Sequence, residues 1–374
     1  MRTVFPFSFD LTDEEVESFM QGAAGILRSG QLILGDHTRE FERSFASFVN
    51  VKHAISVNSG SSALEILLRM KKVEGRVVLV PTNTNFATVA MVLRAGGIVK
   101  YLDMDEGTFA PTLDMVKEAI ALDSNLAGVL WVHIGGVISP EFPLVVEYCR
   151  RSGLFVLEDS AHAHGSKVQG VMSGNLADGA AFSFFPTKVM TTFEGGMITT
   201  NDDQEDYLAR SFRNQGKRGM DFGGLHNDMG NSWRITEMGA LLGKIQLKKL
   251  PDNLERRRQA YGAITAHLEK AGIRFVSAGH MDMASNYKLI VLVPKRFEVK
   301  DVIAALKSDG VNPGGGVYEI PCHRQPVFEG ICPEGSYPIA DTWCPRHICP
   351  PLTAAMSVEE ANFVGEALVR YMSG

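Results

Sequence analysis

A lone lysine and a strand-end carboxylate are the residues of this chain whose types and setting best suit chemistry. Lys188 lies in FSFFPTKVMTTFEGGMITTND (182–202), between an apolar run and a Gly-Gly turn. Upstream, the apolar run of LFVLEDSAHAHG (154–165) ends in Glu158 and Asp159. Pyridoxal phosphate needs such a pair, because a lysine amine forms a Schiff base with it and a carboxylate keeps its pyridine nitrogen protonated. A surface lysine is the commoner case, but the apolar, glycine-bounded setting of Lys188 favours a pyridoxal phosphate site.

A second segment has the features of a phosphate site. VNSGSSAL (57–64) combines a strand, a glycine-containing turn and the start of a helix. The first turn of a helix offers free backbone N–H groups and a positive dipole end to an anion. Such a turn is more often purely structural when it stands alone. Together with Lys188 it predicts that Gly60 and Ser61 bind the cofactor phosphate.

The pattern of elements predicts how these residues meet. Apolar runs at 53–58, 76–82 and 154–159 alternate with helical segments. Strands that are apolar throughout and separated by helices are typical of a mainly parallel sheet covered on both faces. Ligands of such sheets bind outside the carboxyl ends of the strands. We therefore expect the residues around Gly60, Asp159 and Lys188 to share one site.

The lysine segment, FSFF-x-x-K followed by EGGMITTND, resembles the sugar aminotransferases of the DegT/DnrJ/EryC1/StrS family, and the resemblance runs from about residue 35 to the C-terminus. It implies the α/β fold of type I pyridoxal-phosphate-dependent aminotransferases, with a mainly parallel, seven-stranded-type sheet in a large domain and a smaller C-terminal α/β domain. We place the boundary where a helix is expected to end before Pro251. The predicted domains are residues 1–250, including an N-terminal arm, and residues 251–374.

The resemblance also assigns roles to residues around the lysine. It gives Lys188 as the Schiff-base residue, Asp159 as the partner of the pyridine nitrogen, and Ser183 as a further phosphate contact. His162 stands where many relatives have glutamine beside the phenolic oxygen of the cofactor. A histidine can still donate one N–H there, and its titration would make activity more sensitive to pH.

Two segments depart from the family pattern. PTNTNFAT (81–88) has Asn85 at the position of the aromatic residue that stacks on the cofactor ring, with Phe86 one residue later. Either the turn is reshaped so that Phe86 stacks, or Asn85 covers the ring. In GNSWR (230–234), Ser232 aligns with a family asparagine that reaches the neighbouring subunit's phosphate, and Asn231 lies beside it.

A C-terminal segment resembles the substrate entrance of the family. GGGVYEIPCHRQPVF (314–328) is similar to Y-P-x-P-x-H-x-Q-P, so Tyr318, His323 and Gln325 are expected near the substrate. The three glycines lack the strand–helix context of a nucleotide loop. The five cysteines contain no C-x-x-C pair, which predicts free thiols and no metal site.

Composition narrows the classes of protein. A net charge of −6 and a pI near 6.0 argue against nucleic-acid and anionic-membrane partners. The N-terminal residues do not read as a signal peptide, and no apolar run approaches the roughly 20 residues of a membrane span. We expect a cytoplasmic enzyme, and by resemblance a homodimer with shared active sites.

The expected reaction is transfer of an amino group from glutamate or glutamine to a keto sugar, first of all a nucleotide-linked keto-deoxy sugar, in amino-sugar, surface-polysaccharide or antibiotic biosynthesis. A keto-cyclitol or an unactivated keto sugar is the alternative acceptor. A sugar dehydratase of the same family would have histidine in place of Lys188. The chain lacks the glycine fingerprint of a Rossmann-type dehydrogenase. If the protein were a non-catalytic regulator, Asp159, Ser183 and Lys188 would have no evident function.

Overall fold

The centre of the structure is a seven-stranded sheet. The computed structural model describes residues 3–219 and 223–373, and the strand order is β1-β9-β8-β5-β4-β2-β3. The strands are β1 (His53–Val57), β2 (Val77–Pro81), β3 (Ile98–Leu102), β4 (Leu126–Val132), β5 (Phe155–Asp159), β8 (Ala180–Ser183) and β9 (Gly196–Thr200). Strand β9 is antiparallel to β1 and β8, and the other neighbouring pairs are parallel. The predicted mainly parallel sheet is confirmed.

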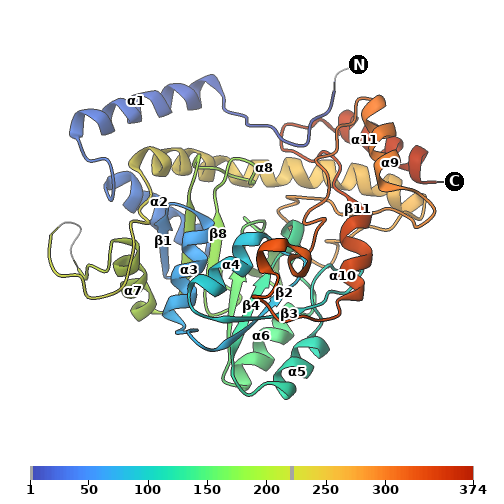
Figure 1. Ribbon diagram of the computed structural model, residues 1–374. Helices are drawn as coiled ribbons and strands as arrows, with labels where there is room; N and C mark the ends of the chain where they lie inside the picture. The colour runs from blue at the N-terminus through green and yellow to red at the C-terminus, as the bar shows by residue number, and fades with distance from the viewer. Residues whose placement is uncertain (1–2, 220–222, 374) are drawn as a thin grey trace.

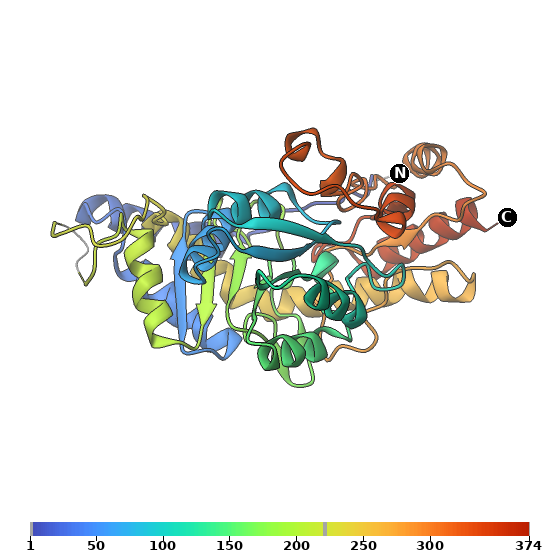
Figure 2. The same ribbon diagram turned by 60° about the horizontal axis from the view of Figure 1, so that its bottom comes forward.

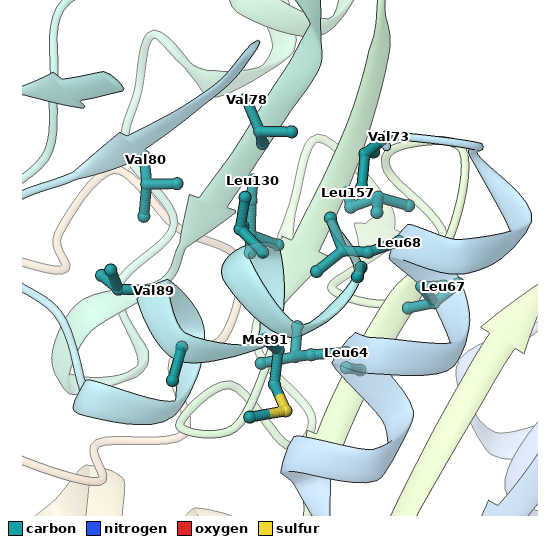
Figure 3. Packing of buried hydrophobic residues seen from close by; sticks show 14 of the residues in the cluster. Leu64, Leu67, Leu68, Val73, Val78, Val80, Val89, Met91, Leu130 and Leu157 are labelled. Atoms are coloured by element: carbon teal, nitrogen blue, oxygen red, sulfur yellow. The ribbon is translucent and has the colours of Figure 1, made fainter. Parts of the chain in front are cut away.

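Helices cover both faces of the sheet. On one face, Leu67 and Leu68 of α3 (Gly60–Met70) and Val89 of α4 (Phe86–Arg94) pack on Leu130 of β4 and Leu157 of β5 (Figure 3). On the other, α5 (Leu113–Leu122) and α6 (Phe142–Arg151) pack on the neighbouring residues of the same strands. Every residue of β4 is buried. Because successive side chains of a strand face opposite sides, an all-apolar strand must be covered twice.

The long helix α8 (Glu237–Lys270) runs without interruption through Pro251 (Figure 1). The helix end expected before Pro251 is therefore wrong. Proline removes one backbone hydrogen bond from a helix, but packing on both sides outweighs that loss here. Leu250 and Leu254 belong to an apolar core that contains the buried Phe41, Phe45, Phe182 and Phe184. Ile264 belongs to a separate apolar core formed by the C-terminal elements.

The C-terminal elements form their own core at one end of the molecule, beside both termini (Figures 1 and 2). Helix α11 (Val358–Met372) starts with a capping box between Ser357 and Glu360. Val4, near the N-terminus, bridges Val311 and is buried in this core. The core supports a second structural unit, and the division at residue 250 stays a prediction.

The remaining helices and strands are short or peripheral. They are α1 (Asp13–Ser29), α2 (Asp36–Val49), α7 (Asp203–Arg213), α9 (Val299–Ser308), α10 (Pro338–Trp343), β6 (Lys167–Val168), β7 (Val171–Met172), β10 (Val291–Leu292) and β11 (His347–Ile348), with 3-10 turns η1 (Ile134–Gly136), η2 (Cys322–Arg324), η3 (Pro326–Phe328) and η4 (Cys344–Arg346). Within residues 3–219 and 223–373, no helix has the length and apolar character to cross a bilayer. The same ranges contain no group of three or more metal-ligating side chains.

The two adjacent acids at the end of β5 have different surroundings. Glu158 is fully buried and accepts hydrogen bonds from the backbone N–H groups of Gly174, Leu176 and Ala177. His133 Nε2 lies 2.9 Å from its Oε2. Glu158 therefore ties the segment after β7 to the sheet, directly behind Asp159.

Replacing Glu158 by alanine should lower the free energy of unfolding by about 3 kcal/mol, because three buried N–H groups and one imidazole lose their partner together. Urea denaturation measures this. Glu147→Ala, which removes an exposed ion pair with Arg151 on α6, should change stability by less than about 1 kcal/mol. Equal effects of the two substitutions would contradict the role of Glu158.

Candidate active site

A cavity of about 430 Å³ lies where β1, β5 and β8 end. Seven of the residues predicted from the sequence line it: Gly60, Ser61, Asn85, Asp159, Ser183, Lys188 and Tyr318. Thr88, Phe185 and Glu194 also line it and were not predicted. The expectation that the ends of these strands share one site is met by the geometry.

Lys188 enters the cavity from the loop between β8 and β9. Its backbone N–H donates to the carbonyl of Phe185, which forms a turn directly after β8. Its Nζ lies 5.0 Å from the centroid of the Tyr287 ring. Burial lowers the pKa of Lys188 to about 8; the Asp159 carboxylate opposes that shift, and Lys288 adds to it. The amine can therefore hold or release a proton close to neutral pH.

Asp159 is held from one side by a chain of hydroxyl groups. Thr88 Oγ1 donates to its Oδ2 at 2.8 Å, and Thr84 Oγ1 in turn donates to Thr88 Oγ1 at 2.9 Å. The backbone N–H of Ala161 donates to Oδ1 at 3.1 Å. Burial raises the pKa of Asp159, although these hydrogen bonds and the nearby Lys188 charge act against it. A cation on the open side of the carboxylate would stabilise its charged form.

Thr84 and Thr88 were not predicted from the sequence, although PTNTNFAT contains a usable signal. Thr84 lies just before Asn85, the N-cap of α4, and Thr88 lies in the first turn of the helix, where the two hydroxyl groups are 2.9 Å apart. The preceding strand β2 ends at the same edge of the sheet as β5. Two small polar residues with that spacing beside a strand-end acid are candidates for orienting it.

The start of α3 forms a cradle in which backbone segments approach closely. The Ser59 side chain caps the helix by accepting from the N–H of Ser62. A Cβ at Gly60 would lie 2.8 Å from Cβ of Ser183, and one at Gly196 would lie 2.3 Å from the carbonyl oxygen of Ser59. Only glycine fits at these two positions. The first N–H groups of α3 have no partner within the helix and face an anion site of the kind that phosphate occupies.

Asn85 and Phe86 have different positions relative to the cavity. Asn85 lines the cavity and caps α4 by accepting from the N–H of Ala87 at 2.9 Å. Phe86 is 52% exposed, and its ring stacks on Phe328 at 5.6 Å. As the first residue of α4 after the cap, Phe86 is turned towards the C-terminal segment. Of the two alternatives for covering the cofactor ring, Asn85 lines the cavity and Phe86 does not, and the choice between them stays a prediction.

His162 is buried behind Tyr318. Its Nδ1 accepts from the N–H of Gly135 at 3.3 Å, and its Nε2 lies 3.2 Å from the hydroxyl of Tyr318. Burial, together with the nearby Lys188 and Lys288 charges, holds the pKa of His162 well below its usual value. The ring is neutral near pH 7, so the pH sensitivity expected from its titration is not supported.

The remaining predicted residues do not line this cavity. His323 lies 2.6 Å from Thr82 Oγ1 through Nδ1 and 2.9 Å from Asp341 through Nε2. The Gln325 amide donates to the carbonyl of Ile320. Asn231 and Ser232 are exposed. The Ser232 hydroxyl accepts from Arg234 at 2.6 Å, and the Asn231 side chain accepts from the N–H of Ser232.

Comparison with known proteins identifies the family. The model of the DegT/DnrJ/EryC1/StrS aminotransferase family matches residues 13–369. The chain belongs to this family. It is 31% identical to the spore coat polysaccharide biosynthesis protein SpsC of Bacillus subtilis, over 99% of this chain and 97% of that protein. It is also 31% identical to a dTDP-3-amino-3,4,6-trideoxy-α-D-glucose transaminase of Streptomyces venezuelae, over 92% and 89% of the two chains.

Solved structures agree with the fold. The S. venezuelae protein DesV superposes with a TM-score of 0.91 over the full length of both chains, at 27% identity. The protein is thus a pyridoxal-phosphate-dependent aminotransferase, and the predicted family, fold and cofactor are confirmed. The residues present fit that cofactor, because the glycine-lined cradle suits its phosphate and a largely buried amine shares the cavity with a buried carboxylate.

The lowered pKa of Lys188 predicts how the cofactor-free protein reacts. Capture of pyridoxal phosphate needs the unprotonated amine, so its rate should rise as pH increases through about 8 and level off above it. Absorbance during capture, measured from pH 6 to 10, gives the midpoint. Asp159→Asn should move the midpoint lower, because the carboxylate raises the pKa of Lys188. A midpoint near the ordinary lysine value of 10.5 would contradict the burial argument.

Proposed function

We propose that this aminotransferase moves an amino group from glutamate or glutamine to the ketone carbon of a nucleotide-linked keto-deoxy sugar. The observation that carries the proposal is the joint placement of Lys188 and Asp159 in one cavity with the α3 cradle, in a chain of this family. SpsC, named for spore coat polysaccharide, and the transaminase named for a dTDP-linked amino sugar support a sugar acceptor. The product would serve amino-sugar, surface-polysaccharide or antibiotic biosynthesis.

Each residue of the cavity has a role in this proposal. Pyridoxal phosphate, when bound, supplies the electron sink for amino transfer. The N–H groups at Gly60 and Ser61 and the Ser183 hydroxyl bind its phosphate, and Asp159 binds the protonated ring nitrogen. Lys188 binds the cofactor covalently between turnovers and carries the transferred proton at Nζ when it is released. Thr88 fixes the Asp159 carboxylate so that the ion pair needs little reorganisation.

The acceptor side of the site is proposed to involve the segment 318–325. Tyr318 lines the cavity, whereas His323 and Gln325 stay predictions as substrate contacts because their hydrogen bonds lie within the protein. A keto-cyclitol and an unactivated keto sugar are the alternative acceptors. The cytoplasmic location also stays a prediction.

A homodimer with shared sites is proposed as the working unit. The N-terminal segment exposes the apolar side chains of Phe5, Phe7 and Phe9, and α1 exposes Met20 and Leu27, the last at 66%. Large apolar side chains exposed along these two segments favour an interaction surface there. A net charge of −6 gives little repulsion between two copies. Asn231 and Ser232 line no part of their own cavity, which is consistent with a contribution to the partner's site.

The reaction itself is tested with a panel of keto substrates. Purified protein with pyridoxal phosphate and glutamate or glutamine should aminate a nucleotide-linked 3- or 4-keto-deoxy sugar, detected by mass spectrometry. Lys188→Ala should reduce turnover by at least about a thousandfold while leaving the fold unchanged, because among the described residues that line the cavity Lys188 alone has an amine for the covalent link and the proton transfer. Lys167→Ala, at the edge of β6, is the matched control and should keep activity.

Three results would count against this assignment. Turnover in Lys188→Ala near that of the native protein would remove Lys188 from the mechanism. Release of water from the sugar with no nitrogen gained would favour the dehydratase. Amination of cyclitols or free sugars alone would replace the proposed acceptor.

Shared sites predict complementation between two inactive variants. A Lys188→Ala chain lacks the amine, and a chain altered at both Asn231 and Ser232 lacks the proposed phosphate contact to its partner. Mixed dimers should recover about a quarter to a half of native activity, because one of the two sites contains both intact contributions. Sedimentation gives the oligomeric state. A fully active monomer, or no recovery after proven subunit exchange, would contradict the prediction.

A further inference from the structure

The His162 ring packs against the rings of Tyr287 and Tyr318, beside Lys188. Its ring centroid lies 4.3 Å from that of Tyr287 and 5.7 Å from that of Tyr318, with interplanar angles of 30° and 14°. Tyr287 also contacts Lys188, whose Nζ lies over its ring. Tyr318 lines the cavity together with Lys188. The neutral imidazole of His162 thus contacts both Tyr287, which lies against Lys188, and Tyr318, which lines the cavity.

The hydrogen bonds of His162 fix which ring nitrogen carries the proton. The backbone N–H of Gly135 can only donate, so Nδ1 accepts from it at 3.3 Å. In a neutral imidazole the proton must then be on Nε2. Nε2–H therefore donates to the Tyr318 hydroxyl, 3.2 Å away. Ser285 Oγ, which donates to the carbonyl of His162 at 2.5 Å, holds the residue in place.

The direction of this hydrogen bond determines what Tyr318 can offer. Its oxygen accepts from His162, so its own hydrogen is available for another acceptor. Burial, and next the charge of Asp159, hold the pKa of Tyr318 well above its usual value, so the hydroxyl stays protonated. Tyr318 also has φ of 58°, a left-handed backbone that is uncommon outside glycine and is concentrated at functional sites.

We propose that Tyr318 presents its hydroxyl proton to an electron-rich oxygen of the molecule bound in the cavity, and that His162 is the positioning residue that sets this direction. The inference rests on the proposed function, which supplies two such oxygens. One is the phenolic oxygen of pyridoxal phosphate, and the other is the carbonyl oxygen of the acceptor sugar. It also replaces the sequence-based expectation that His162 itself donates to the cofactor.

Tyr318→Phe tests the proposal, because it keeps the ring stack and removes only the hydroxyl. The holoenzyme is measured in three ways: the pH at which the bound cofactor's visible band changes without substrate, the single-turnover rate with the amino donor, and the single-turnover rate with the keto sugar. If the acceptor is the cofactor oxygen, the spectral midpoint should rise by about one pH unit, a tenfold change in proton affinity. If it is the sugar oxygen, the midpoint stays and the keto-sugar step should slow about tenfold or more.

Two variants of His162 separate positioning from simple packing. His162→Gln has an amide that accepts from Gly135 and donates to Tyr318, so it should stay within about threefold of the native protein in all three measurements. His162→Leu fills a similar space without either hydrogen bond, and should shift the same quantity as Tyr318→Phe in the same direction.

The proposal is overturned if Tyr318→Phe retains both the native spectral midpoint and the native keto-sugar rate. It is equally overturned if His162→Gln and His162→Leu behave alike. Both comparisons are made on a native enzyme that aminates its acceptor. If the native protein binds pyridoxal phosphate but aminates no acceptor, the proposed function is refuted instead. Failure of the Tyr318 proposal and failure of the proposed function are therefore distinguishable.

Discussion

Burial of an amine and a carboxylate beside each other, at the ends of two apolar strands, is the constraint on which the site depends. Removing either charge from water is costly, and the cost is reduced when the opposite charge shares the same space. Both residues show this cost in their pKa values. Burial lowers the pKa of Lys188 and raises that of Asp159, and the charge of each residue opposes the shift of the other. Burial therefore brings the pKa of Lys188 to about 8, and it raises the pKa of Asp159 above its usual value.

The sheet topology explains why the two groups meet. Strands β1, β5 and β8 run in the same direction, so their ends lie at one edge, whereas β9 returns antiparallel and begins there. The loop between β8 and β9 therefore stays at that edge and brings Lys188 into the cavity. Gly196 begins β9 against the carbonyl of Ser59, where a larger residue would push the α3 cradle away. The reversed strand thus positions both the lysine and the phosphate cradle.

The sequence predicted the parts of the site that lie in the chain directly after apolar strands. Gly60, Asp159 and Lys188 could be placed together because strand ends in a parallel sheet share an edge, and Ser183 was added by the family resemblance. Side-chain partners from separate segments could not be found in this way. Tyr287, for example, contacts Lys188 and His162 from outside any regular element, so only the folded packing reveals it.

Predictions from local sequence were wrong or incomplete where packing between distant segments determines the structure. Pro251 predicts a helix end, but apolar residues on both sides of it are anchored in two different cores, and α8 continues. The sequence left open whether Asn85 or Phe86 covers the cofactor ring, since the position of Phe86 depends on Phe328, which lies far along the chain and stacks on its exposed ring. The resemblance predicted that Lys188 and Asp159 share a site, and both line one cavity, but it could not predict orientations that depend on such distant contacts.

The neighbouring acids of β5 show how one strand end can serve both stability and chemistry. Glu158 is satisfied by backbone N–H groups and His133 within the protein, whereas Asp159 keeps one side open to the cavity. In the proposed binding mode, a protonated ring nitrogen on that side would supply the missing cation and lower the cost of the buried carboxylate. Because a ligand that binds only the folded chain adds to its stability, a cofactor bound to Asp159 would also stabilise the strand end that presents it.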